Sequence, residues 1–348
     1  MRGLVVDPGR PDSARVVDDL PEPDEAEGDT LVEALAVGIC GTDREIAAGQ
    51  YGEAPVPGGP LVLGHESLGR VVASASADLR PGDLVAGIVR RPDPVPCPNC
   101  AVGEWDMCRN GRYTECGIKF RHGFARERWR VDSAFAVKLD PALGDHGVLL
   151  EPTSVVAKAW EHIEHLGRRA RWTPATLLVT GAGPIGLLAA LLGVQRGLDV
   201  HVLDRVTEGP KPDLVRRLGA AYHTGPATDL GLSPDIVVEC TGAPEVITTV
   251  LSAVGLDGIV CLTGVSARGH LVPLDIGETN RNMVMENNVV FGSVNANRRH
   301  WQAAAQALTT ADPDWLSALV TRRLPLAGFA DALIARPDDV KVVLDLTV

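Results

Sequence analysis

The spacing of hydrophobic residues changes near residue 151. Before that position, short apolar runs such as "TLVEALAVGIC" (30–40) and "LGRVVASA" (68–75) lie between stretches rich in Gly and Pro. Short runs of this kind are typical of β-strands in an irregular, barrel-like domain. The segment "PTSVVAKAWEHIEHL" (152–166) instead spaces its apolar residues as an amphipathic helix does. We therefore expect two regions that differ in secondary structure.

Apolar strands and helices alternate from about residue 176 to residue 298. Alternation of this type predicts right-handed βαβ units around a parallel sheet, which is a doubly wound α/β fold. Beyond residue 298 the alternation stops and helical segments follow. The predicted strands are 176–181, 199–204, 235–242, 258–264 and 288–294, and the predicted helices are 184–197, 212–220 and 244–254.

Charge and cysteine usage limit the class of protein. The formal net charge of −12 argues against a nucleic-acid partner, because phosphates would repel such a surface. No leader-like segment and no apolar run of membrane-spanning length is recognisable, so we expect a cytoplasmic protein without membrane contact. An odd number of cysteines, seven, argues against a disulfide framework. Cys240 and Cys261 lie in apolar runs and are interpreted as small core residues.

A glycine-rich motif, "LLVTGAGPIGLL", connects the first predicted strand of the alternating region with its first helix. Gly181 permits a tight turn, Gly183 lets the backbone approach a pyrophosphate, and Gly186 allows close helix–strand contact. Pro184 and Ile185 complete the turn, whose free N–H groups would bind the phosphates. The motif predicts a dinucleotide site, and an ordinary βα turn is the alternative.

An acidic residue follows the second strand of this region. Asp204, in "VHVLDR", lies eighteen residues past Gly186. A carboxylate at this place binds the ribose hydroxyls and repels a 2′-phosphate, so we favour NAD over NADP. Arg205 follows directly and could still accommodate that phosphate, which leaves NADP as the alternative.

Side chains that bind metals stand in three separate segments. Cys40 lies in "VGICGTDREI", His65 and Glu66 lie in "LGHES", and Glu151 lies in "GVLLEPTSVV". Thiolate, imidazole and carboxylate are ligands of zinc, and a catalytic zinc keeps three protein ligands and one exchangeable position. A hydrogen-bonded core histidine is the alternative for His65 alone. Its combination with Cys40 and a nucleotide-binding turn favours a metal site.

The motifs "GICGTDREI", "LGHES", "LLEP", "GAGPIG" and "GSVN" occur in the order typical of the zinc-containing medium-chain dehydrogenases. The chain resembles that superfamily over essentially its full length, and "GSVN" with the downstream "RRHW" looks most like its glucose dehydrogenase branch. The resemblance implies a GroES-like, β-rich catalytic domain of residues 1–154 and 299–348. It also implies a Rossmann domain of residues 155–298.

The same resemblance assigns roles to the metal-binding side chains. Cys40, His65 and Glu66 would bind a catalytic zinc, and Glu151 would bind it directly or through its water. Thr42 would contact the reacting alcohol and take part in proton relay.

Other residues correspond by position to substrate and cofactor contacts. Glu115 and His300 resemble sugar-contacting residues, while Thr241, Thr263 and Asn295 would lie at the cofactor, Asn295 near the nicotinamide. A surface acid, a helix-end histidine and a turn asparagine are the alternatives for Glu115, His300 and Asn295. Members of this family are usually dimers or tetramers, so the resemblance implies a homodimer or homotetramer.

The cysteine cluster "CPNCAVGEWDMC" resembles the structural-zinc lobe of the family, in which four cysteines are spaced C-x2-C-x2-C-x7-C. The last three positions hold Cys97, Cys100 and Cys108. Pro94 stands at the first position and offers no side-chain ligand. Asp93 or Cys116 could supply the fourth ligand that a closed site needs, and an empty lobe is the alternative.

The implied reaction moves a hydride from a sugar hydroxyl, at C1 of an aldose such as glucose, to the nicotinamide and yields a lactone. Zinc would lower the pKa of that hydroxyl, so that its proton can leave near neutral pH. A polyol, cyclitol, amino-sugar or secondary-alcohol dehydrogenase with the same zinc chemistry is the alternative. A non-catalytic NAD-binding scaffold and a zinc-free reductase are disfavoured, because neither needs an open metal position.

Overall fold

Two compact units make up the part of the chain that the computed structural model describes, which is residues 1–267 and 269–348. Unit 1 consists of Met1–Ser154 and Asn295–Val348, and unit 2 consists of Val155–Val294. The sequence analysis placed the second division after residue 298.

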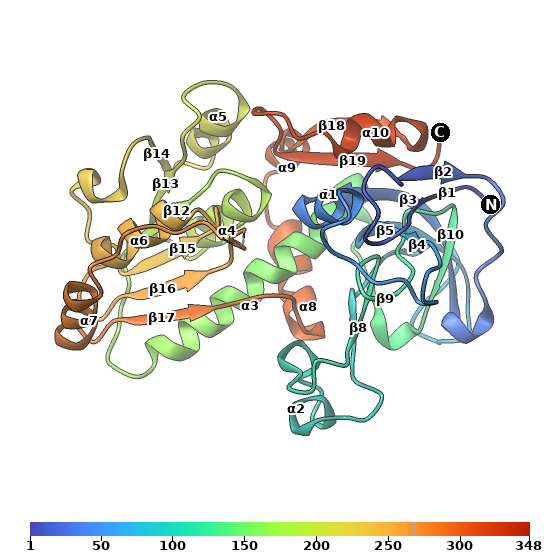
Figure 1. Ribbon diagram of the computed structural model, residues 1–348, viewed down its shortest axis with the longest axis horizontal. Coiled ribbons are helices and arrows are strands. Elements are labelled where there is room, and N and C mark those ends of the chain that lie inside the picture. Colours follow the sequence, from blue (N-terminus) through green and yellow to red (C-terminus); the bar gives the residue numbers. More distant parts are fainter. Residues whose placement is uncertain (268) are drawn as a thin grey trace. The chain divides into compact units, whose positions relative to one another are not determined.

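The main sheet of unit 1 contains seven strands (Figure 1). Their order is β11 (Ala136–Lys138), β6 (Leu84–Gly87), β5 (Glu66–Ser74), β3 (Thr30–Ile39), β19 (Lys341–Asp345) and β18 (Val320–Pro325), with β10 (Arg128–Val131) also paired to β3. The long strand β3 is rich in small and β-branched apolar residues, most of them buried, which suits a central strand.

The strand register gathers separate parts of the chain at one end of this sheet. Gly38 of β3 pairs with Glu66 of β5 on one side and with Val343 of β19 on the other, both antiparallel. Cys40 lies just past the end of β3, and His65 lies just before the start of β5. Residues from two motif-bearing segments and from the C-terminal strand are therefore brought close together.

Smaller elements complete unit 1. The two three-stranded sheets are β2 (Arg15–Val17), β1 (Gly3–Val6), β4 (Leu61–Val62) and β7 (Arg90–Arg91), β8 (Thr114–Cys116), β9 (Phe120–Arg121). The α-helices are α1 (Gly41–Ala47), α2 (Pro98–Ala101), α8 (Arg298–Thr309), α9 (Pro313–Leu319) and α10 (Phe329–Leu333). The 3-10 helices are Glu25–Glu27, Trp105–Met107, Ser133–Phe135, Pro141–Leu149 and Leu326–Gly328.

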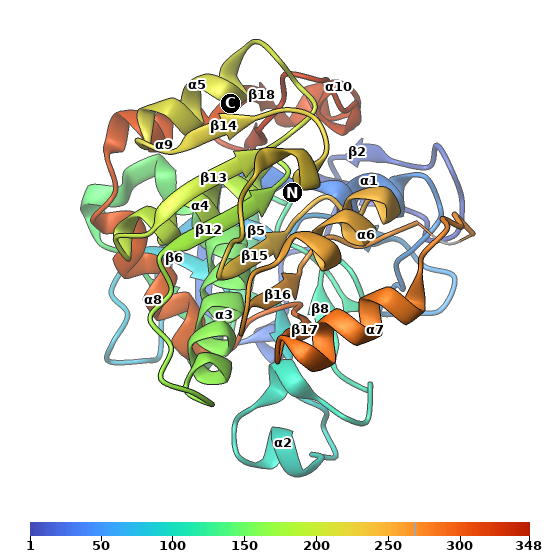
Figure 2. The same cartoon turned by 90° about the vertical axis from the view of Figure 1, so that its left-hand side faces the viewer.

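Unit 2 contains a six-stranded parallel sheet with helices. The strand order is β14 (Ala221–His223), β13 (Asp199–Leu203), β12 (Thr176–Thr180), β15 (Ile236–Glu239), β16 (Ile259–Leu262) and β17 (Val289–Gly292). The helices are α4 (Pro184–Gln195), α5 (Pro210–Arg217), α6 (Pro244–Ala253), α7 (Ile276–Met285), the 3-10 helix Ala227–Leu230 and most of α3 (Leu150–Gly167), which begins in unit 1. Helix α6 lies against β15, and α7 lies next to α6 (Figure 2).

The core of unit 2 explains its sequence pattern. Leu178, Val237 and Val260, from three neighbouring strands, pack with Val250 of α6. Parallel strands are covered on both faces and therefore read as continuous apolar runs. In α4 every residue of the range 186–193 is buried, so its uniformly apolar sequence belongs to a core helix. The predicted fold class, a GroES-like β-rich region with a doubly wound Rossmann region, is confirmed.

Within residues 1–267 and 269–348, none of the helices has the length and apolar character required to cross a membrane.

Candidate active site

Cys40 and His65 meet where β3 ends and β5 begins. Sγ of Cys40, the N-cap residue of α1, lies 3.1 Å from Nε2 of His65. Gly64 has a φ of +87°, a conformation that L side chains rarely adopt, and this bend turns His65 toward Cys40. The glycine before His65 is thus required by the backbone.

The carboxylate of Glu66 forms a buried ion pair with Lys341. Nζ of Lys341 lies 2.7 Å from Oε1 and 2.5 Å from Oε2 of Glu66, and both side chains are almost fully inaccessible. A Cβ atom on Gly38 would lie 1.9 Å from Oε2 of Glu66, so glycine is needed where the carboxylate crosses β3. Burial opposes the charge of Lys341, but the charges of Glu66 and Cys40 outweigh it and raise the pKa of the ammonium group.

Glu151 reaches the same cluster from the first turn of α3. One ligand atom each from His65, Glu66 and Glu151 lies within 4.8 Å of the other two, and the same holds for Cys40, Asp43 and His65. Burial raises the pKa of Glu151 to about 7; the charge of His65 opposes this shift and that of Glu66 adds to it. A divalent cation beside such a buried acid would stabilise its ionised form.

Asp43 orients the imidazole ring of His65. Oδ2 of Asp43 accepts a hydrogen bond of 3.0 Å from the backbone N–H of Cys40, and Oδ1 lies 3.5 Å from Nδ1 of His65. Burial opposes both charges, but the charges of Cys40 and Asp43 raise the pKa of His65, and that of His65 lowers the pKa of Asp43. A carboxylate beside the far nitrogen of a metal-binding histidine fixes the ring and its tautomer. Nε2 is thereby left facing Cys40.

Sequence reasoning missed Asp43 and Lys341. Asp43 had a local signal, because it stands three residues after Cys40 and forms a capping box at the start of α1. Lys341 opens the apolar run "KVVLDL" and lies 275 residues from Glu66, so only the pairing of β19 with β3 reveals its role.

The donor set of this cluster fits a zinc ion. It combines a thiol, an imidazole nitrogen and two carboxylates, which are ligand types of catalytic zinc sites. Nδ1 of His65 and Oδ1 of Asp43 are buried 3.5 Å apart, and within the described residues neither atom has a hydrogen-bond partner, so each faces the other. Thr42 is partly buried in the first turn of α1, next to Asp43.

The residues expected at the sugar lie elsewhere in unit 1. Glu115 is 5 % exposed, so it is not a surface acid. Its Oε1 accepts hydrogen bonds of 2.9 Å from Nε of Arg90 and from Nδ2 of Asn295, which brings Glu115 and Asn295 together. Asn295 has a φ of +61°, which asparagine tolerates in turns. His300 is buried in the first turn of α8, where its Nδ1 accepts a 2.9 Å hydrogen bond from the backbone of Asn297.

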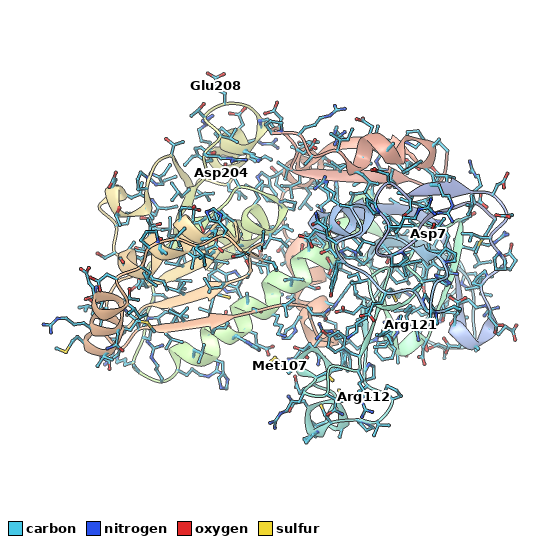
Figure 3. The ribbon with its side chains drawn as sticks, in the orientation of Figure 1. Asp7, Met107, Arg112, Arg121, Asp204 and Glu208 are labelled. Atoms are coloured by element: carbon cyan, nitrogen blue, oxygen red, sulfur yellow. The ribbon has the colours of Figure 1, made fainter. Side chains whose placement is uncertain are left out.

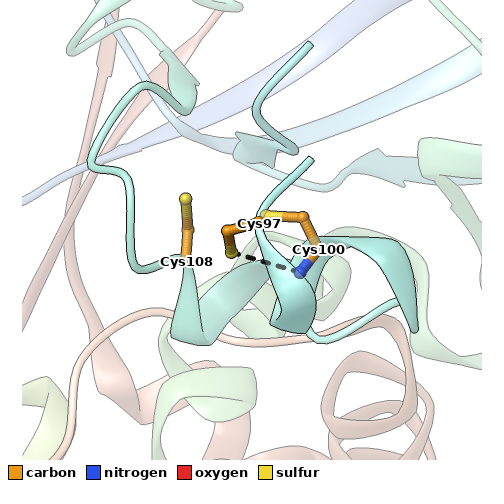
Figure 4. A group of neighbouring side chains, drawn as sticks. All are labelled: Cys97, Cys100 and Cys108. Atoms are coloured by element: carbon orange, nitrogen blue, oxygen red, sulfur yellow. Dashed lines mark hydrogen bonds between the residues drawn. The ribbon is translucent and has the colours of Figure 1, made fainter. Parts of the chain in front are cut away.

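The cysteine lobe brings three of the expected ligands together (Figure 4). The sulfur atoms of Cys97, Cys100 and Cys108 lie within 4.8 Å of one another. The backbone N–H groups of Arg109 and Cys100 donate to Sγ of Cys97, both at 3.4 Å, and lower the pKa of that thiol to about 6. Burial raises the pKa of Cys100 to about 11. Neither Asp93 nor Cys116 has a ligand atom in this group of three.

The glycine-rich turn of unit 2 has the geometry that its motif predicts. Gly181 has a φ of +92°, and a Cβ on Gly186 would lie 1.8 Å from the carbonyl oxygen of Gly181. A Cβ on Gly183 would meet no atom within 4 Å, so that residue is not required by the packing of the protein itself. Gly183 is the N-cap of α4, with Pro184 and Ile185 in the first turn. Free N–H groups at such a helix end are the groups that bind phosphates in dinucleotide-binding folds.

Asp204 is held beside this turn. Its Oδ2 accepts a hydrogen bond of 2.6 Å from the backbone N–H of Ala182, and its Oδ1 accepts one of 3.0 Å from Val206. Figure 3 labels Asp204 in unit 2. The next side chain, Arg205, is exposed.

Thr241 and Thr263 follow the ends of the adjacent strands β15 and β16. Both bind the buried residue Glu239: its side chain accepts a 2.7 Å hydrogen bond from the backbone N–H of Thr241, and its carbonyl oxygen accepts one of 2.8 Å from Oγ1 of Thr263. These residues and Gly181 therefore share the carboxyl edge of the parallel sheet, where dinucleotides bind in doubly wound folds.

Comparison with known proteins agrees with this geometry. The family "Glucose dehydrogenase C-terminus" matches residues 144–346, and "Alcohol dehydrogenase GroES-like domain" matches residues 26–141. The chain is 38% identical to the glucose 1-dehydrogenases of Methanocella arvoryzae and Thermoproteus tenax, in each case over 99% of both chains. It is also similar to the structure of Haloferax mediterranei glucose dehydrogenase in complex with NADP, Zn and gluconolactone, with a TM-score of 0.92, 31% identity and 100% of both chains covered.

Matches over the whole length show an enzyme of the zinc-containing, NAD(P)-using medium-chain dehydrogenase class. Within that class, the chain belongs to the glucose dehydrogenase branch, as its sequence motifs predicted.

Proposed function

We propose that this protein oxidises the C1 hydroxyl of glucose, or of a similar aldose, to the lactone. The C1 hydrogen leaves as a hydride to C4 of the nicotinamide, the hydroxyl proton goes to solvent, and a C1 carbonyl forms. The observation that carries the proposal is that His65 shares one group of ligand atoms with Glu66 and Glu151 and another with Cys40 and Asp43, in a chain whose full-length relatives are named glucose 1-dehydrogenase.

The metal cluster would hold zinc through Cys40, His65 and Glu66, with Glu151 bound directly or through the water on the metal. Bound zinc lowers the pKa of an alcohol, so that its proton can leave near neutral pH. Lys341 is a buried cation beside Glu66, and Asp43, close to His65, adds a further buried carboxylate to the site. A divalent cation would offset part of the negative charge of these carboxylates.

Other side chains would position the sugar and move its proton. Thr42, only partly buried beside Cys40, would accept the hydroxyl proton at Oγ1 and pass it toward solvent. Arg90 and Asn295 contact Oε1 of Glu115, so Oε2 would accept a hydrogen bond from a sugar hydroxyl. His300 would bind another hydroxyl, and Asn295 would contact the cofactor near the nicotinamide.

Asp204 would contact the adenosine ribose of the cofactor and so determine whether NAD or NADP is preferred. Its carboxylate is fixed by two backbone N–H groups, and a 2′-phosphate would have to approach that charge. We therefore expect NAD to be preferred. The Haloferax enzyme was crystallised with NADP, so both cofactors have to be compared. Asp204→Ser should shift kcat/KM toward NADP, whereas Arg205→Ala should lower activity with NADP and leave that with NAD unchanged.

Steady-state assays with glucose, galactose and xylose, each with NAD and NADP, test the proposed reaction. We expect turnover of at least one aldose and formation of the lactone. Turnover of a polyol, cyclitol or secondary alcohol without turnover of any aldose would move the assignment to the alternative substrate class. Zinc-free protein that binds NAD but oxidises none of these substrates would support a non-catalytic scaffold.

The protein would act as a homodimer or homotetramer. Strand β17 forms an edge of the parallel sheet, and Ile276, Val284 and Met285 of α7 expose 66–69% of their surface. Exposed sheet edges and apolar side chains of this kind favour association. Light scattering coupled to gel filtration would measure the mass, and a monomer at assay concentration would contradict this expectation.

A further inference from the structure

The cysteine lobe brings three thiols within 4.8 Å of one another, and no fourth ligand joins this group within residues 1–267 and 269–348. Residues 93–112 form this lobe, and Figure 3 labels Met107 and Arg112 on it. Its backbone favours a thiolate at Cys97, because Sγ of that residue accepts hydrogen bonds from the N–H groups of Cys100 and Arg109. N–H donors to sulfur are what a metal–thiolate site requires from its surroundings.

Asp93 is already committed to other partners. Its side chain is fully inaccessible, Oδ1 accepts a 2.8 Å hydrogen bond from the backbone N–H of Val95, and Oδ2 accepts one of 2.8 Å from Nδ2 of Asn110. Oδ2 also lies 3.4 Å from Nε of Arg112. To bind a metal, Asp93 would have to give up contacts that hold the lobe together.

No other acid or thiol of the described lobe takes its place. Glu104 forms an ion pair of 2.8 Å with Arg299, and Asp106 accepts a 3.0 Å hydrogen bond from Asn297. Cys116 is buried within β8 and lies outside the group of three sulfur atoms. Pro94, at the position where the family pattern has its first cysteine, offers no donor atom.

The lobe is also open to solvent. Cys100 and Cys108 are only partly buried, and Val95, Val102 and Met107 around them expose 48–76% of their surface. A small molecule can therefore reach a metal held by the three sulfurs.

We propose that the lobe is an open three-thiolate metal site, in which the fourth tetrahedral position of zinc is filled from solution by water and can be taken by a small thiol. A closed structural site keeps its ion because four protein ligands surround it. With only three protein ligands, the ion can be removed by chelators and can bind ligands from solution. This inference does not depend on the proposed sugar oxidation.

Cobalt substitution in a Cys40→Ser background tests it, because thiolate–cobalt absorption then comes from the lobe. We expect the Cys40→Ser protein, whose lobe is unchanged, to bind one cobalt ion. Its absorption spectrum should change when 2-mercaptoethanol is added, and EDTA should remove the ion. Pro94→Cys should supply the missing ligand, abolish the response to the thiol and slow release by at least about tenfold. Pro94→Ala is the matched control at this exposed position and should behave as the parent.

Three results would overturn the proposal: no thiolate–cobalt absorption at all, a spectrum unresponsive to the thiol with release as slow as in Pro94→Cys, or weaker binding in Asp93→Asn with an altered cobalt spectrum. The last result would make Asp93 the fourth ligand. Thermal denaturation of each variant separates a loss of metal from a loss of folding, and the thiol response of the parent decides the matter if Pro94→Cys does not fold.

Discussion

Unit 1 contains two clusters of metal-binding side chains that are built in opposite ways. The first cluster, Cys40, His65, Glu66 and Glu151, is drawn from three distant segments and is held by strand register. The second, Cys97, Cys100 and Cys108, lies within one short lobe and depends on local turns and backbone donors. The first cluster therefore depends on long-range assembly, whereas the second depends on one short stretch of chain in which Val95, Val102 and Met107 are exposed.

The clusters also differ in how their charge is balanced. Lys341 is buried against Glu66, and Asp43 lies against His65, so the first cluster carries compensating groups of its own. Backbone N–H groups contact the sulfur of Cys97 in the lobe, and the carboxylate of Asp93 is engaged by Val95 and Asn110. We propose that the exchangeable position of the first cluster serves the chemistry, whereas that of the lobe takes no part in it.

The sharpest contrast is expected from removing one thiol of each cluster. Cys40→Ser should lower kcat/KM for glucose on the order of a thousandfold, because a catalytic metal contributes several kcal/mol. Cys97→Ser should remove the lobe metal and leave kcat/KM within a few-fold of the parent. NADH binding, measured by fluorescence, should be unchanged in both. Equal losses of activity would erase the distinction between the clusters.

Removal of Lys341 probes the charge balance. Lys341→Met in metal-free protein leaves a buried carboxylate unpaired, and we expect a loss of about 3–5 kcal/mol in the free energy of unfolding by urea. Bound zinc should reduce this loss, because the cation replaces the ammonium charge beside Glu66. The double variant Lys341→Met/Glu66→Gln should recover much of the stability. No recovery would show that the ion pair is not the cause.

Gly38 tests the strand register that forms the first cluster. Gly38→Ala forces a Cβ into a place 1.9 Å from Oε2 of Glu66, so we expect destabilisation of about 1–3 kcal/mol together with a lower zinc content. Gly41→Ala is the control, since a Cβ on Gly41 would meet no atom within 4 Å. Unchanged stability and zinc content in Gly38→Ala would contradict the described approach of Glu66 to β3.

The smallest effect is expected in the lobe. Pro94→Cys should raise the free energy of unfolding in the presence of zinc by about 1 kcal/mol, since a tenfold gain in affinity stabilises the native state by that order. Pro94→Ala should give no metal-dependent gain. Chemical denaturation with and without zinc measures both, and a gain that persists without metal would point to the backbone instead.

The sequence predicted those parts of this molecule that depend on local pattern. Alternating apolar segments predicted the parallel sheet, and the glycine spacing predicted a turn in which Gly181 has a positive φ and Gly186 packs against it. The four members of the first cluster were recognised from short motifs. Strong local signals carry this information, because turns and helix ends restrict which residues can occupy them.

The rest depends on contacts between remote segments. The pairing of Lys341 with Glu66 follows from the order of β5, β3 and β19, which no local pattern of residues specifies. For a similar reason, the sequence alone left the fourth ligand of the lobe undecided. Asp93 is a possible ligand by composition, and only its hydrogen bonds to Val95 and Asn110 show that it is already engaged.

Diffraction from crystals of the purified protein, recorded on both sides of the zinc absorption edge, would locate bound zinc directly. We predict an anomalous peak within bonding distance of Sγ of Cys40 and Nε2 of His65, with a carboxylate of Glu151 or Glu66 beside it. Zinc-replete protein that oxidises glucose and yet shows no peak among these side chains would contradict the account.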